Sequence, residues 1–164
     1  MVKQLIRVAL LFGIAISGAL LAVAQDCRTL TAQLDRLRQE REPAWTVARK
    51  GVVDANYASV HLKAGKERIG IMIMILRSAE EATECFKSWN NEISDPELQT
   101  PIEANRLKGS IAELGDQNYL WSCPSHTAAT ILFRQRNAFV MVIGTSENAA
   151  QRFALLVAEQ LAAR

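Results

Sequence analysis

The sequence has 164 residues, of which 19 are lysine or arginine, 17 are aspartate or glutamate and 6% are aromatic. Two of the basic residues, Lys3 and Arg7, lie before Ala24, so the chain from Gln25 onward has 17 residues of each sign. This balance gives no sign of nucleic-acid binding, and the few aromatic residues are not interleaved with a basic stripe. The length suits one domain with one hydrophobic core.

The segment from Met1 to Ala24 has its own pattern. After the short basic start, residues 8–24 are apolar or small, and they end in Ala22-Val23-Ala24. Small residues at these positions fit a signal peptidase, so we expect a signal peptide, residues 1–24, cleaved after Ala24. The alternative is an uncleaved anchor, for which the apolar run is short against the roughly 20 residues of a membrane-spanning helix. The prediction is a secreted or periplasmic protein with a single domain, residues 25–164.

The domain begins with a predicted helix over Cys27–Arg41. Leucines at positions 30, 34 and 37 fall on one stripe of this helix, and Pro43 ends it. Residues 44–49 and 57–63 are predicted strands. The second of them alternates apolar and polar residues, which is typical of a strand with one face in water.

Residues 71–76 are apolar on both faces, which predicts a strand in the middle of a sheet. Ser78 follows as a predicted helix N-cap. The next helix has an apolar stripe made of Ala82, Cys85, Phe86, Trp89 and Ile93. Residues 118–123 form another predicted strand, and residues 127–134 and 138–144 form a hairpin. Ser146 then caps a final helix, whose stripe consists of Ala150, Phe153, Ala154, Val157 and Leu161.

The two halves of the domain repeat one another when Ile71 is aligned with Phe139. Residues 71–75 then match residues 139–143, the two serine caps coincide, and so do all five stripe positions. Residues 44–93 and 118–163 are therefore interpreted as two strand–strand–strand–helix units. The predicted fold is α+β: one antiparallel sheet of about six strands, with both unit helices on one face, plus an N-terminal helix.

The apolar central strands also indicate a binding surface. If both faces of these strands are buried, something must cover the sheet face away from the unit helices. The candidates are the N-terminal helix, a second copy of the chain, or a lipid-like ligand. Met72 and Met74 lie on the central strand, and methionine suits an adaptable apolar contact, so they are the predicted binding residues.

The chain contains three cysteines, Cys27, Cys85 and Cys123. Export places them in an oxidising compartment, which predicts one disulfide and one remaining thiol. Cys85 lies on a buried helix stripe, where cysteine packs as a small apolar group. The favoured pair is therefore Cys27 with Cys123, a bridge that would stabilise the fold by about 3–5 kcal/mol. Pairing of Cys85 with either of the other two is the alternative.

Cys123 has a second interpretation. It precedes a proline, and His126 lies three residues further on, as in some sites where an imidazole lowers the pKa of a thiol. No second cysteine completes a CxxC pair, and His61 is the only other histidine, with no metal-ligand spacing. No catalytic residue, metal site or cofactor is predicted. A small exported thiol or metal-dependent protein using Cys123 and His126 is the alternative function.

The sequence from Gly115 to Tyr119, the turn at residues 132–137 and the closing helix resemble poorly characterised secreted domains of bacteria. The resemblance implies an exported α+β module without an assigned activity. The leading hypothesis is thus a non-enzymatic binding or interaction module of the cell envelope. Its expected partner is an unidentified protein or an apolar ligand, a homodimer is a further alternative, and nucleic acid is not expected.

Overall fold

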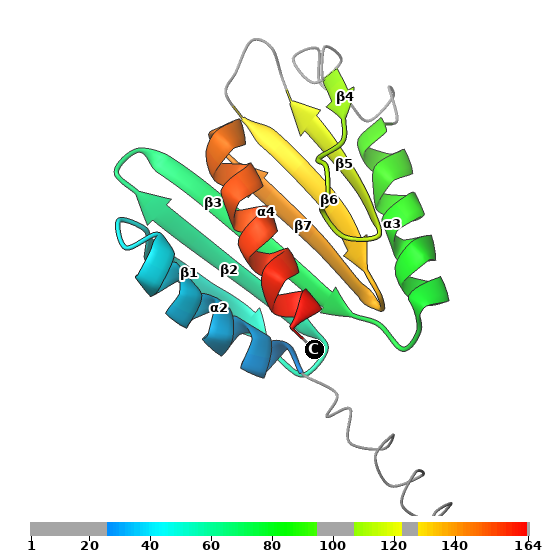
Figure 1. The fold of residues 1–164 in the computed structure, drawn as a ribbon, viewed down its shortest axis with the longest axis horizontal. Coiled ribbons are helices and arrows are strands. Elements are labelled where there is room, and N and C mark those ends of the chain that lie inside the picture. The colour runs from blue at the N-terminus through cyan, green and yellow to red at the C-terminus, as the bar shows by residue number, and fades with distance from the viewer. Residues whose placement is uncertain (1–25, 95–106, 123–127, 164) are drawn as a thin grey trace, which may run out of the picture.

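The structure, a computed structural model, describes residues 26–94, 107–122 and 128–163. These residues form one seven-stranded antiparallel sheet with helices on both faces (Figure 1). The order of the strands is β1-β2-β3-β7-β6-β5-β4. Their bounds are Thr46–Val53 for β1, Tyr57–Ala64 for β2, Glu67–Ile75 for β3, Leu107–Gly109 for β4, Gln117–Ser122 for β5, Ala129–Gln135 for β6 and Ala138–Gly144 for β7. The predicted α+β class and the antiparallel sheet are confirmed. The predicted signal peptide lies outside the described residues.

The two apolar strands lie side by side in the middle of the sheet. β3 pairs with β7 in antiparallel register, with Met72 opposite Met141. Ile71 and Ile73 of β3 and Val140 and Val142 of β7 are buried on the same face. The expected central placement of these strands is therefore confirmed, and each has a strand neighbour on both sides.

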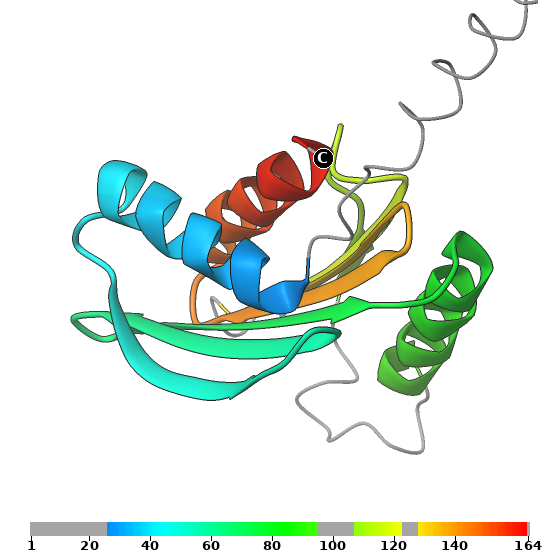
Figure 2. The ribbon, with the colours of Figure 1, turned by 90° about the horizontal axis from the view of Figure 1, so that it is seen from below.

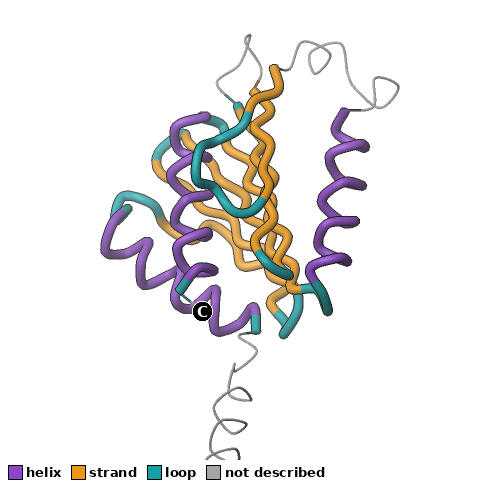
Figure 3. Tube along the Cα trace, turned by 45° about the vertical axis from the view of Figure 1, so that its right-hand side comes forward, coloured by secondary structure: helices purple, strands orange, loops and turns teal. Residues whose placement is uncertain are grey.

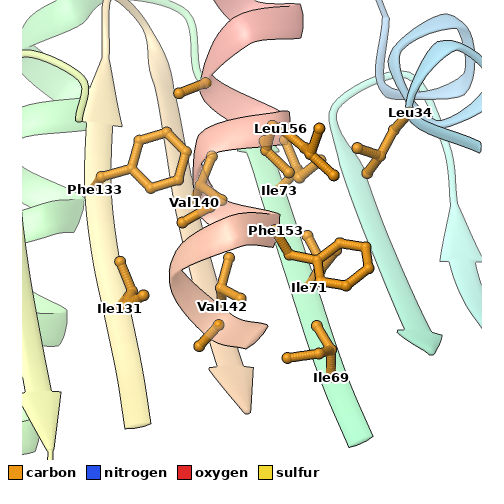
Figure 4. Close-up of a cluster of buried hydrophobic side chains, with 14 of the residues drawn as sticks. Leu34, Ile69, Ile71, Ile73, Ile131, Phe133, Val140, Val142, Phe153 and Leu156 are labelled. Atoms are coloured by element: carbon orange, nitrogen blue, oxygen red, sulfur yellow. The ribbon is translucent and has the colours of Figure 1, made fainter. Parts of the chain in front are cut away.

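Two helices cover this face of the sheet. α2 (Cys27–Arg41) and α4 (Glu147–Ala162) contact each other, α4 lies on β6 and β7, and α2 contacts β2 and β3. Phe153 and Leu156 of α4 meet the isoleucines of β3 and the valines of β7 in the main core (Figure 4). The Trp45 ring, between α2 and β1, meets the Phe153 ring edge-on at a centroid distance of 5.1 Å.

The third helix, α3 (Ala79–Ser94), lies on the opposite face, where it packs against β6 and β7 (Figure 2). Phe86 of α3 meets Leu132 and Phe139 in a second, smaller core. Figure 3 shows α3 on one side of the strands and the α2–α4 pair on the other. This differs from the expectation, which placed both unit helices on one face and considered the N-terminal helix as cover for the other.

The strand register explains why the two unit helices lie on opposite faces. The alignment of the two halves matches Met72 with Val140, but the residue beside Met72 in the sheet is Met141. Because side chains alternate between faces, a shift by a single position moves the aligned residues to opposite faces. Met72 thus faces the side of α3, and Val140 faces the side of α4. The aligned pair Met72 and Val140 thus faces α3 from one strand and α4 from the other.

Both helix caps lie where the sequence predicts them. The backbone N–H of Glu81 donates to Ser78 Oγ at 3.2 Å, and the backbone N–H of Ala149 donates to Ser146 Oγ at the same distance. These serines satisfy amide groups that have no partner within the first turn of a helix. The caps fix the start of α3 and α4 directly after the central strands.

Candidate binding surfaces

The α3 face of the sheet is only partly covered. α3 packs against β6 and β7, and no described helix lies over β1 and β2 on this face (Figure 2). Beside α3, the side chains of β2, β3 and β7 border a shallow depression of about 200 Å³. We call this surface the open face, and it consists of Tyr57, Ser59, His61, Gly70, Met72, Met141 and Ile143. Ile143 is 47% exposed, which is high for a large apolar side chain at the centre of a sheet.

The two predicted binding residues lie at the boundary between the open face and α3. Met72 and Met74 are both half-buried, and both contact the smaller core under α3. Met72 also borders the depression, whereas Met74 does not. The structure therefore places Met72 in the candidate surface. The polar rim, Tyr57, Ser59 and His61, was predicted as the water-facing side of its strand but not as part of the binding surface.

Gly70 keeps the depression open. It lies directly opposite His61 in the β2–β3 ladder. A Cβ atom at Gly70 would come no closer than 3.6 Å to the His61 ring, which is an ordinary van der Waals contact. The sheet therefore tolerates a side chain here, and the absence of one leaves space between the histidine and the methionines.

A second and larger cavity lies on the other face of the sheet, between α2 and the β1–β2 hairpin. We call it the α2 groove, and its volume is about 500 Å³. The sheet side contributes apolar residues from both strands and one lysine, namely Val47, Lys50, Val53, Val60 and Leu62. The helix side contributes mostly polar residues, namely Arg28, Thr31, Ala32, Leu34, Asp35, Arg36, Arg38 and Gln39. The sequence did not predict this cavity, because the first predicted strand ended at residue 49.

The structure describes two of the three cysteines, Cys27 and Cys85. Cys27 is buried at the start of α2, and its Sγ lies 3.9 Å from the Ile73 carbonyl oxygen. Cys27 and Cys85 are not bonded to each other. Cys123 and His126 lie outside the described residues, so the predicted Cys27–Cys123 disulfide stays a prediction. The described residues contain no group of three or more histidine, cysteine, aspartate or glutamate side chains that could hold a metal ion.

Burial raises the pKa of the half-buried Cys85 thiol. We expect iodoacetamide to modify Cys85 more slowly in the native protein than in guanidinium-unfolded protein at pH 8, because only the thiolate reacts. The raised pKa also means that the folded protein disfavours the thiolate. The free energy of unfolding is therefore highest below the pKa of an unfolded thiol, about 8.5. It decreases as the pH rises through the folded-state pKa. Peptide mapping by mass spectrometry measures the two rates. Equal rates would contradict the prediction.

The residues that resemble secreted bacterial domains have structural roles. The Asn118 side chain accepts from the Ile111 amide at 2.7 Å and donates to the Leu114 carbonyl at 2.8 Å. Asp116 accepts from the Arg136 amide at 2.7 Å and forms an ion pair with Arg134 at 3.0 Å. These contacts join the loop before β5 to the β6–β7 turn. The pattern therefore stabilises a connection within the fold.

None of the helices in the described part of the chain has both the length and the apolar character needed to cross a bilayer. Comparison with protein-family models, with curated proteins and with solved structures finds no match. The likeness to secreted bacterial domains thus stays a sequence-based interpretation.

Proposed function

We propose that the protein is an exported, non-enzymatic binding or interaction module of the cell envelope, and that the open face is its contact surface. The observation that carries the proposal is an apolar patch, Met72, Met141 and the 47% exposed Ile143, at the centre of a sheet beside a covering helix. Apolar patches rimmed by polar residues mark interaction sites on soluble proteins.

The shape of the open face favours a protein partner. The depression of about 200 Å³ is smaller than the roughly 300–1,000 Å³ of most small-molecule sites. A flat sheet surface with two methionines can instead accommodate an apolar side chain from a partner, because methionine adapts its shape. Tyr57, Ser59 and His61 would then form a polar rim at the edge of the contact. A second copy of the chain is one form that this partner can take.

The proposal is tested with a photo-crosslinking residue at position 143 and, as a matched control, at position 155. Ile143 and Leu155 are exposed to a similar extent, 47% and 45%, but Leu155 lies on α4 and faces away from the sheet surface concerned. In the native host we expect a defined crosslinked species from position 143 and none from position 155. Its mass distinguishes a second copy from another protein.

The substitution Ile143→Glu provides the matching loss-of-binding test. We expect it to abolish the crosslink made from a neighbouring open-face position such as Ser59, because it places a charge within an apolar contact. Leu155→Glu should leave that crosslink unchanged. Since both positions are exposed, unfolding midpoints should change little. Crosslinks of equal yield from positions 143 and 155, or none from either, would refute the open face as the contact surface.

A further inference from the structure

We propose that the α2 groove is a second binding site, and that it takes an amphipathic anion, that is, an apolar chain with a carboxylate or phosphate head group. This site is on the opposite face of the sheet from the open face, so the inference goes beyond the proposed function and does not depend on it. Three properties of the groove carry it: its size and apolar floor, its charge, and the irregular strand that forms one side.

The groove has the size and the lining of a small-molecule site. Its volume of about 500 Å³ falls within the range of roughly 300–1,000 Å³ that is usual for ligand pockets. The floor consists of valine and leucine side chains, and three of them, Val47, Val53 and Val60, remain half-buried. α2 leaves them partly uncovered because its buried stripe, including Leu30 and Leu34, packs toward the main core. An apolar chain would cover this floor.

The charges around the groove are mainly positive. Four basic residues line it, and Asp35 is the only carboxylate among the lining residues. Asp35 already forms an ion pair with Arg38 at 2.8 Å, and Arg38 also donates to the Trp45 carbonyl. Among the described residues, no carboxylate forms an ion pair with Arg28, Arg36 or Lys50. Asp26 interacts electrostatically with Arg28, so Arg36 and Lys50 are the donors that an anionic group would find without a neighbouring ion pair.

These three basic side chains border different parts of the groove. Arg28 and Arg36 are on the helix side, eight residues apart, which corresponds to about 12 Å along the axis. Lys50 is on the strand side, between Val47 and Val53. A ligand lying on the valines could thus place its head group at Lys50 together with one of the two arginines.

The irregular backbone of β1 places Lys50 in the groove. Val47 is opposite Leu62 and Arg49 is opposite His61, so β1 has one extra residue between them. With strict alternation, Val47 and Lys50 would point to opposite faces of the sheet. The bulge instead puts Lys50 opposite Val60, on the groove side.

A second irregularity follows directly after Lys50. Val53 is opposite Ala58, and β1 again has one residue more than β2 between the pairs. As a result, Val53 lies on the groove side together with Lys50. Gly51 lies within this irregularity, where a Cβ atom would come within 3.0 Å of the Ser59 Cβ atom. Bulges that turn a side chain are frequent next to binding and active sites.

The test uses the purified protein and four probes: dodecanoate, dodecyl phosphate, dodecanol and inorganic phosphate. Calorimetry measures the affinities, and NMR of labelled methyl groups locates the ligand. We expect dodecanoate, dodecyl phosphate or both to bind at micromolar concentration and to shift the methyl signals of Val47, Val53 and Val60. Dodecanol should bind at least tenfold more weakly, because it has no charge, and inorganic phosphate should not bind measurably. The stronger of the two anions identifies the head group.

Two neighbouring residues of β1 provide a matched pair of variants. We expect Lys50→Gln to weaken binding of the better anion by about five- to tenfold, because a charge-assisted hydrogen bond is lost. Arg49→Gln removes the same charge from the next residue, which pairs with His61 and faces the other side of the sheet, and should leave the affinity unchanged. Either Arg28→Gln or Arg36→Gln gives a second, independent reduction, according to which arginine joins Lys50 at the head group. All four residues are exposed, so the fold should persist.

Several outcomes would overturn the inference. These are the absence of binding by either anion, equal affinities for dodecanol and the anions, and equal effects of the Lys50 and Arg49 substitutions. Methyl shifts at Met72 and Met141 without shifts at the valines would place the ligand on the open face and refute the groove. Failure of the crosslinks from position 143, by contrast, would refute the proposed function and leave the groove unaffected.

Discussion

Replacing Phe153 by alanine is expected to lower the free energy of unfolding by about 3–5 kcal/mol, the usual cost of emptying the space of a buried phenylalanine. The Phe153 side chain has no exposed surface and lies over the central strands (Figure 4). It also meets the Trp45 ring edge-on. Since α2, α4 and the sheet meet around Trp45 and Phe153, neither helix can move into the vacated space without losing its own contacts. With a total stability of about 5–15 kcal/mol, this change could remove half of it.

The control for Phe153 lies on the same helix. Leu155 is 45% exposed, so Leu155→Ala should change the free energy of unfolding by no more than about 0.5 kcal/mol. Urea denaturation followed by circular dichroism gives both values, provided that the two variants unfold with the same dependence on urea. A cost below about 1 kcal/mol for Phe153→Ala would mean that the core does not pack around this ring.

Patterns within single elements predicted most of the fold correctly. The apolar run at residues 71–76 identified a central strand, because a strand that is apolar on both faces normally has neighbours on both sides. Cover on both faces was also expected, but Met72 and Met74 are only half-buried. The serines at positions 78 and 146 identified the starts of two helices, since their hydroxyl groups satisfy amides of the first turn. These signals are local, so they do not depend on how the elements are arranged in space.

The placement of the helices and of the candidate sites depends on strand register, which the sequence did not reveal. Whether α3 covers the same face as α4 is decided by a single residue, because Met72 pairs with Met141 and not with Val140. In the same way, one extra residue in β1 turns Lys50 to the side of α2. Alternation alone would have placed that lysine on the opposite face. A glycine within β1, Gly51, was the available signal for such a bulge.

Gly115→Ala is the second substitution with a large expected effect, about 2–3 kcal/mol of lost stability. Gly115 has a φ of 60°, in the left-handed region that costs residues with a Cβ atom energy. A Cβ atom there would also lie 2.5 Å from the Arg134 carbonyl oxygen. That oxygen accepts the Asp116 amide at 2.7 Å, so relieving the clash would disturb the contact between the loop before β5 and the end of β6.

Gly65 separates the two components of the effect at Gly115. Its φ of 56° is nearly the same, but a Cβ atom there would meet nothing within 4 Å. Gly65→Ala should therefore cost only the backbone term, about 1 kcal/mol, and the difference between the two variants measures the clash with Arg134. Chemical denaturation of both proteins gives that difference. Equal losses would show that the close approach at Gly115 relaxes freely, and that this loop does not hold β5 and β6 in register.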